Sequence, residues 1–432
     1  MSPNPSLLLI MMCGLFLKAI YIYSLCVCIE VPSFWLQVYH LICYNHHNMK
    51  SRAKRLFLIF HGRFPSEKAA SLFAAKEGEA FGKIGLSVTV LVPRRFGRFK
   101  VEPHDYYNLE NNFEVRYLPT IDILNIGFLK GLSFKLSFLT FSLVSFVYLF
   151  FKANKQDLIY SNESLPILFS TFYFPNTLYE LHDFPEGKRF FYRLLFQKVK
   201  HLLITNIWKT EEVIRLFGVN REKIICERNA VEVKDFDIPV EMEEARDKLK
   251  LPKDKKVIIY TGHLYSWKGA DTLAEATKML PKDYLTVFVG GTNEDVNNFK
   301  AKYGGVEKIL IVGHKERGEI PLWQKSADIL VLPNTAKEGI SKYYTSPMKL
   351  FEYMASKRPI VATDIPSIRE IVNEENAIMV LPDDPNSLVE GIKKAINDKD
   401  LVEKITEKAY SDVLIHTWEK RAGRILDFVE RK

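Results

Sequence analysis

The stretch SPMKLFEYMASKRPIVATDIPSIREIV, from Ser346 to Val372, decides the fold that the sequence predicts. Its first part has apolar residues at helical spacing, and the short apolar run PIVATD that follows is typical of a buried strand. A second such run, AIMVLP, comes shortly afterwards. Helices that alternate with buried strands predict a doubly wound α/β domain with a parallel sheet.

The beginning of this stretch also predicts a binding site. Ser346 and Pro347 suit the cap and the first position of a helix, so the free amides of the next residues would point at a ligand. A helix N-terminus is a ready site for a diphosphate. Glu352 lies about one and a half turns further, where a carboxylate can accept hydrogen bonds from ribose hydroxyls. Considered in isolation, Glu352 would be interpreted as a partner of the helix dipole. The neighbouring motifs favour the ribose-binding interpretation instead.

The same alternation extends through the body of the chain. Four more apolar runs after residue 255 predict strands: KVIIYTG, LTVFVGG, ILIVGH and ADILVLPN. An earlier series begins at Arg55 and consists of RLFLIFH, SVTVLVP, FEVRYLP, DLIYSN, TLYEL and HLLITN. A charged segment near residues 237–255 separates the two series and predicts a domain boundary. Two halves of nucleotide-binding size predict a ligand in a cleft between the carboxyl ends of their strands.

Composition agrees with two globular domains. A chain of 432 residues with 47% hydrophobic and 26% charged residues can build two well-packed cores. The formal net charge of +8 indicates an anionic partner, and charge alone leaves a nucleotide diphosphate, a nucleic acid and an acidic membrane face open. Four of the five cysteines precede the first predicted strand, which excludes a disulfide framework for the body. No Cys/His cluster has the spacing of a structural zinc site.

The first 53 residues differ from the body. Leu7 to Ile29 is apolar, broken only by Lys18, and long enough to cross a bilayer, yet it lacks the basic start and the cleavage site of a secretory signal. As an anchor it would leave the body in the cytosol, because basic residues follow it. The favoured alternative is that Met49 is the true start. Both interpretations predict a cytoplasmic body.

A second apolar stretch runs from Phe128 to Phe151 and is interrupted by Lys130 and Lys135. We interpret it as a helix that covers the sheet, because a predicted strand follows it directly. Its content of Phe, Leu and flanking lysines also fits an interfacial helix, so peripheral contact with a membrane is a hypothesis.

Several common catalytic motifs are absent from the sequence, which reduces the number of enzyme classes to consider. The sequence contains no G-x-x-x-x-G-K-[ST], G-x-G-x-x-G after a strand, G-x-S-x-G or H-E-x-x-H, which disfavours common ATPases, dehydrogenases, serine hydrolases and zinc peptidases. The two D-x-D matches, at Asp235 and at Asp398, fall in a linker and a charged turn and are interpreted as incidental. In YTGHLYSWKGAD, by contrast, Lys268 follows a strand and precedes a helix. A lysine there can neutralise a departing diphosphate, although taken alone it would be a surface lysine.

These motifs in this order resemble the family 4 retaining glycosyltransferases, which have the GT-B fold of two Rossmann-like domains facing across a cleft. The likeness covers roughly residues 54–432 and is most specific in the second half. It implies an acceptor-binding domain at 54–240, a nucleotide-sugar-binding domain at 250–410, and a final helix at 411–432, around Trp418, that crosses back to the first domain. Residues 1–53 would be an extension.

The resemblance also implies roles for individual residues. In the second domain, the donor nucleotide would be bound by Gly262, His263, Lys268, Gly313, His314, Pro347, Met348, Lys349 and Glu352. Among these, Lys268 and the backbone amides around Pro347 to Lys349 would hold the diphosphate, Glu352 the ribose, and the loop of Gly313 and His314 the nucleobase. His182 would lie near the donor sugar and act with Lys268 in catalysis, its alternative being an ordinary loop histidine. Gly62 would let the backbone approach the reacting groups, or would serve only as a turn glycine. Asn229 is expected to be structural.

Two positions depart from the family pattern. Tyr344, which is expected to bind the substrate, stands where the first carboxylate of Glu-x7-Glu would contact the donor sugar, so the choice of donor is open. His263 replaces the arginine that usually follows the strand glycine, which removes a permanent positive charge from the phosphate site.

The sequence thus predicts a glycosyltransferase that moves a sugar from a nucleotide-diphosphate sugar to a hydroxyl acceptor with retention of configuration and without a metal or a bound cofactor. Expected partners are the nucleotide sugar, a surface glycan or lipid-linked acceptor, and the inner membrane surface, but no nucleic acid. A sugar-nucleotide epimerase of the same fold is an alternative. Another is a catalytically silent, membrane-associated scaffold, which the changes at Tyr344 and His263 motivate.

Overall fold

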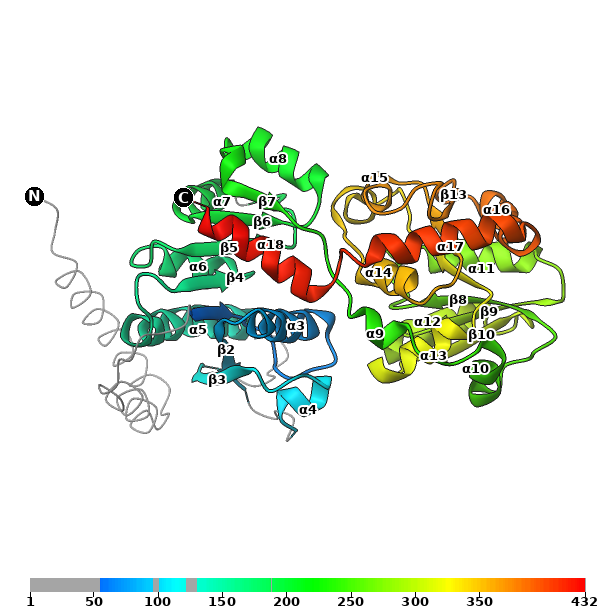
Figure 1. Ribbon diagram of the computed structural model, residues 1–432, viewed down its shortest axis with the longest axis horizontal. Helices are drawn as coiled ribbons and strands as arrows, with labels where there is room; N and C mark the ends of the chain where they lie inside the picture. Colours follow the sequence, from blue (N-terminus) through cyan, green and yellow to red (C-terminus); the bar gives the residue numbers. More distant parts are fainter. Residues whose placement is uncertain (1–54, 96–100, 122–129, 188, 432) are drawn as a thin grey trace, which may run out of the picture.

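The computed structural model describes residues 55–95, 101–121, 130–187 and 189–431, and the arrangement of its elements is shown in Figure 1. The predictions about an N-terminal anchor and a start at Met49 lie outside the described residues.

The first domain is built on a parallel sheet of seven strands. Its order is β3-β2-β1-β4-β5-β6-β7. The strands are β1 (Arg55–Ile59), β2 (Ser87–Arg94), β3 (Phe113–Pro119), β4 (Leu158–Ser161), β5 (Thr177–Leu181), β6 (His201–Ile204) and β7 (Ile224–Cys226). Every residue of β4, β5 and β6 is buried, which explains the apolar runs in the sequence, since helices cover both faces of such a sheet.

The second domain repeats this plan with six parallel strands. Its order is β10-β9-β8-β11-β12-β13. The strands are β8 (Lys256–Thr261), β9 (Tyr284–Val289), β10 (Ile309–Gly313), β11 (Ile329–Leu332), β12 (Ile360–Thr363) and β13 (Ile378–Val380). The fold class predicted from the sequence is therefore confirmed, and β7 is the one strand of the described sheets that the sequence did not predict.

Helices connect the strands and cover the sheets. In the first domain they are α3 (Ala69–Lys83), α4 (Pro103–Tyr107), α5 (Lys130–Lys152), α6 (Ser164–Ser170), α7 (Arg189–Lys198) and α8 (Ile207–Phe217). The short helices α9 (Val233–Phe236) and α10 (Met242–Leu249) lead into the second domain. There follow α11 (Ala270–Met279), α12 (Asn293–Tyr303), α13 (Ile320–Lys325), α14 (Met348–Ala355), α15 (Pro366–Arg369), α16 (Pro385–Asn397) and α17 (Lys399–Val413).

The last helix, α18 (Trp418–Glu430), returns to the first domain, where it lies beside α3 (Figure 1). Trp418 and Ile425 are buried in the same apolar cluster as Phe73 and Phe81 of α3. The C-terminal helix thus belongs to the core of the first domain, although its sequence follows the second.

Helix α5 has one buried and one exposed face. Phe141 and Leu149 are fully buried in a cluster with Ile159 of β4, so the helix covers the sheet as the sequence predicts. Phe134 and Phe151 on this helix are 58% and 54% exposed. Among the helices of the described residues, α5 alone is long and apolar enough to cross a membrane, and a third of its most apolar window is buried in the protein.

In each sheet the strand order reverses beside the first strand, next to β1 and next to β8. Ligands of open parallel sheets bind outside the carboxyl ends of the strands at such a point. Gly62 follows β1 and Gly262 follows β8, so both predicted glycines lie at these positions.

Candidate active site

The loop after β8 carries three of the predicted residues. Gly262 has φ +122°, a conformation that suits glycine. His263 turns away from the strand, with its ring stacked on Tyr265 and its Nδ1 3.5 Å from Asp295 Oδ2. The short 3-10 turn Ser266–Lys268 then places Lys268 directly before α11. The sequence prediction that Lys268 ends this loop and precedes a helix is confirmed.

The Lys268 ammonium lies in a partly buried, charged environment. It is 5.0 Å from the centre of the Trp267 ring and interacts electrostatically with Asp295 and Glu352. Burial lowers its pKa from 10.5 to about 8, against the two carboxylates, which raise it. An anion beside Lys268 would favour the charged form of the amine.

Helix α14 supplies the next group, with one correction to the sequence prediction. The helix begins at Met348, Pro347 occupies the cap position, and no side chain caps the helix. Ser346 was predicted to be the cap, but its hydroxyl oxygen accepts a hydrogen bond from the Asn229 backbone N–H at 3.4 Å, and its carbonyl accepts one from the Asn229 side chain. Ser346 therefore joins the helix start to the segment between the domains. The first amides of α14 still have no acceptor within the helix.

Glu352 is 8% exposed and accepts a hydrogen bond from Arg317 Nη1 at 3.2 Å. Arg317 begins the short turn after β10, three residues beyond His314. The sequence analysis missed it, although its place in a loop already assigned to the nucleobase was the available signal. Gly313, with φ +85°, ends β10, and His314 after it is exposed.

The side chain of Lys349 is the main feature that sequence analysis did not foresee, since only its amide was predicted to bind. Lys349 Nζ is buried and has no hydrogen-bond partner among the described residues. It lies 3.9 Å from the centre of the Tyr260 ring, and a Cβ on Gly262 would be 3.9 Å from it. Burial, followed by the nearby Lys268, holds the pKa of Lys349 well below its ordinary value.

His182 lies at the carboxyl end of β5, in the first domain. Its Nε2 is 3.1 Å from Glu180 Oε1, its ring packs edge-on against Phe73, and its side chain is 31% exposed. The neighbouring Lys209 donates a hydrogen bond of 2.8 Å to the His182 carbonyl. The Lys209 hydrogen bond thus holds the backbone of His182, and the Glu180 carboxylate lies beside its ring.

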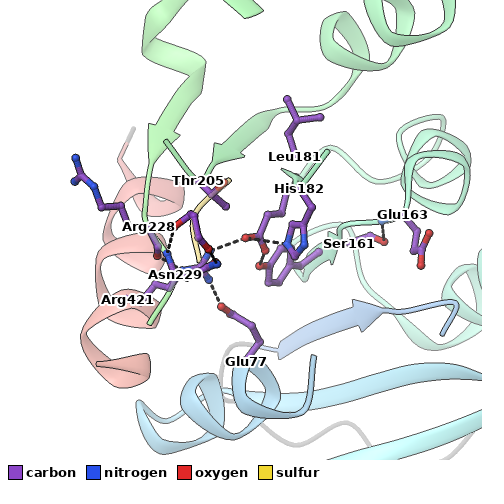
Figure 2. A network of polar contacts seen from close by, with 12 residues as sticks. Glu77, Ser161, Glu163, Leu181, His182, Thr205, Arg228, Asn229 and Arg421 are labelled. Carbon is purple, nitrogen blue, oxygen red and sulfur yellow. Dashed lines mark hydrogen bonds and ion pairs between the residues drawn. The ribbon is translucent and has the colours of Figure 1, made fainter. Parts of the chain in front are cut away.

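A buried ion network supports this histidine (Figure 2). Arg421 of α18 is fully buried and contacts Glu180 at 2.6 Å, the carboxylate of Glu77 on α3, and the carbonyl of Arg228. Burial lowers the Arg421 pKa to about 9. The C-terminal helix is thus linked to the position of His182 through a single carboxylate, that of Glu180.

The loop after β1 is closed by polar contacts. The His61 backbone N–H donates to Glu163 Oε1 at 3.1 Å, and the His61 ring nitrogen Nε2 lies 3.2 Å from Ser137 Oγ. Arg95 donates a hydrogen bond of 3.0 Å to the His61 carbonyl. Next to it, Gly62 has no room for a side chain, because a Cβ would lie 2.1 Å from the Phe60 ring.

Tyr344 lies between the domains. Its hydroxyl donates a hydrogen bond to Glu186 of the first domain, and its ring packs against Phe184 and Trp208. Met348 also reaches the first domain, where it packs against the apolar cluster that contains Trp418. A direct role of Tyr344 at the donor sugar remains a prediction.

The structure therefore groups Gly262, Lys268, Lys349 and Glu352 at the carboxyl edge of the second sheet. His182 and Gly62 lie at the corresponding edge of the first sheet, and Tyr344 and Met348 lie where the two domains touch. A diphosphate fits the first group best, since two amines and the amides of a helix start converge there.

Comparison with known proteins shows which family and fold the chain resembles. Residues 241–412 match the family model of glycosyl transferases group 1. An uncharacterised glycosyltransferase of Methanocaldococcus jannaschii is 26% identical over 221 residues, which are 49% of this chain and 55% of the relative. The D-inositol 3-phosphate glycosyltransferase of Xylanimonas cellulosilytica is 22% identical over 51% of this chain and 54% of its own length. The chain thus spans about half the length of these curated relatives.

Solved structures share the whole described fold. The Anabaena protein HepE in complex with UDP and glucose has a TM-score of 0.67 at 17% identity, covering 88% of this chain and 100% of that one. Sucrose-phosphate synthase from Thermosynechococcus elongatus has a TM-score of 0.69 at 17% identity, over 87% and 98%. WaaG, a glycosyltransferase involved in lipopolysaccharide biosynthesis, has a TM-score of 0.63 at 14% identity, over 87% and 100%.

Proposed function

The chain belongs, by residues 241–412, to the glycosyl transferases group 1 and has the GT-B fold, and from this premise we propose that it transfers a sugar from a nucleotide-diphosphate sugar to a hydroxyl acceptor with retention of configuration. The observation that carries the proposal is the pair of amines, Lys268 and Lys349, beside the start of α14. A transferase needs positive charge where its leaving diphosphate develops negative charge.

Each part of the site has a task in this reaction. Lys268 and the amides at the start of α14 neutralise the diphosphate as the bond to the sugar breaks. Glu352 accepts hydrogen bonds from the ribose, with Arg317 holding the carboxylate in place. His182, fixed by Glu180 and Lys209, contacts the sugar from the first domain. The leaving phosphate itself helps to take the proton from the acceptor hydroxyl, so no protein nucleophile is required.

The acceptor is proposed to be a surface glycan or its lipid-linked precursor, bound by the first domain. This domain carries α5, whose exposed apolar residues Phe134 and Phe151 lie toward its two ends, next to Lys135 and Lys152 in the sequence. Such a helix can rest on the inner membrane surface, where a lipid-linked acceptor is found. The structural likeness to WaaG supports an acceptor of this class.

Membrane contact is tested by sedimentation with vesicles that contain anionic lipids. Replacing Phe134 and Phe151 with Asp is expected to lower vesicle binding of the full chain about tenfold, because two apolar contacts are lost. Phe172→Asp, at a residue that is 65% exposed outside α5, is the matched control. Equal binding by all three proteins would contradict the proposal for α5.

The proposed reaction is tested by a screen of the full chain against UDP-, GDP-, ADP- and dTDP-sugars, with thermal shift and donor hydrolysis as readouts. One class of donor is expected to stabilise the protein. Lys268→Ala and Glu352→Ala should abolish that shift, whereas Lys300→Ala, at an exposed lysine of α12, should keep it. No response to any donor would reject the transferase and leave the silent scaffold. Product analysis distinguishes transfer to an acceptor from epimerisation.

A further inference from the structure

The Lys349 ammonium is buried without a hydrogen-bond partner among the described residues. A buried amine that makes no hydrogen bond lowers the stability of a protein, so such groups are rare outside functional sites. The ammonium lies over the Tyr260 ring, 3.9 Å from its centre, and this ring attracts a cation without the geometry of an ordinary hydrogen bond. Tyr260 is itself held in place, because its hydroxyl donates to the His263 carbonyl at 2.5 Å. The amine is positioned for a group that is not part of the chain.

The charges around this amine indicate an anion. Lys268 and Glu352 are the charged groups that act on Lys349. The Glu352 carboxylate is already engaged by Arg317 at 3.2 Å, so the repulsion between the two amines has little compensation. The first amides of α14 lie on the same helix as Lys349 and add partial positive charge. A dianion such as a diphosphate satisfies both amines at once, whereas a single carboxylate would leave one of them without a partner.

The loop after β8 does not supply the second cation. His263 follows Gly262, but its ring is stacked on Tyr265 and directed to Asp295, and burial and Lys268 lower its pKa below the ordinary value of 6.5. Lys349 approaches the same glycine from α14, since its Nζ would be 3.9 Å from a Cβ on Gly262. A cation from α14 therefore reaches the place that the loop leaves uncharged.

We propose, on the basis of the proposed function, that the side chain of Lys349 is the second cation of the diphosphate site and takes over the charge that His263 does not provide. Lys268 and Lys349 then both contact the diphosphate, one from the β8–α11 loop and one from α14. Because the empty site disfavours two charged amines, Lys349 takes up a proton when the diphosphate binds. The groups that face it are Lys268 from the β8–α11 loop, Glu352 on its own helix and Tyr260 on β8.

The test is isothermal titration calorimetry of the full chain with UDP, with uridine and with inorganic pyrophosphate. Lys349→Met is expected to weaken binding of UDP and of pyrophosphate about tenfold or more, and to leave the binding of uridine unchanged. Lys300→Met is the matched control on the surface of the same domain. Since methionine removes a buried amine without a partner, the variant should melt at or above the temperature of the wild-type chain.

A second readout does not depend on how well the variant folds. At pH 7 Lys268 already carries its proton, and the titration of pyrophosphate itself is common to all variants. Titrations in two buffers of different ionisation enthalpy should therefore show a larger net uptake of protons with pyrophosphate in the wild-type chain than in Lys349→Met. The Lys349→Met variant should take up fewer protons when it binds pyrophosphate. Wild type and Lys349→Met could show equal affinity and equal proton uptake while Lys268→Ala loses binding. That result would reject the role of Lys349 and leave the proposed function standing. If the wild-type chain binds neither pyrophosphate nor any of UDP, GDP, ADP and dTDP, both the role of Lys349 and the proposed function are rejected.

Discussion

Gly269 joins the loop of Lys268 to α11 and has φ +73°. A Cβ at this position would lie 1.7 Å from the carbonyl oxygen of Pro333, which is backbone and cannot move aside cheaply. Gly269→Ala is therefore expected to lower the free energy of unfolding by about 3 kcal/mol or more, measured by urea unfolding, and to displace Lys268. Gly305→Ala has open space around the new methyl group and should change stability by less than about 1 kcal/mol. Equal losses in the two variants would show that the clash is not what makes Gly269 necessary.

His61 predicts how stability depends on pH. Burial, with Arg95 second, lowers its pKa from 6.5 to about 3, so the folded protein keeps the ring neutral while the unfolded chain takes up a proton below pH 6.5. The contribution of this residue to stability is complete above pH 6.5 and decreases as pH falls. At pH 5.5 the loss is about 1.4 kcal/mol relative to pH 7.5.

The measurement is urea unfolding at pH 7.5 and pH 5.5 for the wild-type chain and for His61→Gln, which keeps a polar side chain but does not titrate. The difference in free energy between the two pH values should be smaller in the variant by about the same 1.4 kcal/mol. An identical pH dependence in both proteins would assign the acid sensitivity to other groups.

At the scale of elements, the contribution of α18 to stability depends strongly on one residue. Arg421 is fully buried between the carboxylates of Glu77 and Glu180. Arg421→Met would leave two buried carboxylates without their cation, so the free energy of unfolding should fall by about 3 to 5 kcal/mol. Lys420→Met, on the exposed side of the same helix, is the control and should have little effect. Turnover should fall in Arg421→Met as well, because Glu180 also holds the His182 ring.

A second substitution tests this explanation. Glu77→Gln in the Arg421→Met background removes one of the stranded charges and is expected to restore about 1 kcal/mol or more of the lost stability. If it restores none, the loss comes from the contact of the guanidinium group with the Phe73 ring, whose centre lies 5.2 Å from the guanidinium carbon.

The sequence predicted elements well because parallel strands buried on both faces leave continuous apolar runs. It missed β7, a three-residue strand at the edge of the sheet, because so short a run has no periodicity. The local rule that places Ser before Pro at a helix start failed at Ser346, since its hydroxyl contacts Asn229, 117 residues earlier. In the site, motif residues such as Lys268 and Glu352 were found from their positions beside helix ends. Arg421 was not, because its partners Glu77 and Glu180 are 344 and 241 residues away along the chain.

At the scale of the molecule, the contacts between the domains join segments that follow the carboxyl ends of their strands. Glu370 accepts hydrogen bonds from the backbone N–H groups of Ile207 and Trp208 at the start of α8, the shortest being 2.8 Å. The Trp208 ring stacks on Tyr343 and Tyr344 of the second domain, with ring centres 5.1 and 5.5 Å apart. These contacts are polar and aromatic and few in number, as in domains that move relative to each other.

Trp208 offers the clearest way to weaken this junction without touching either core. Trp208→Ala removes both stacking contacts, each worth about 0.5 to 1.5 kcal/mol, but keeps the backbone N–H that binds Glu370. The balance should shift toward separated domains, so small-angle scattering of the variant should give a larger radius of gyration than that of the wild-type chain. Because Lys268 and Lys349 belong to the second domain and His182 to the first, the donor KM should rise while binding of the nucleoside diphosphate alone stays the same. Phe172→Ala, at an exposed aromatic residue of the first domain that makes none of these contacts, should leave the scattering unchanged. If Trp208→Ala scatters like the wild-type chain, the Glu370 contacts and the α18 crossing hold the domains together without the aromatic stack.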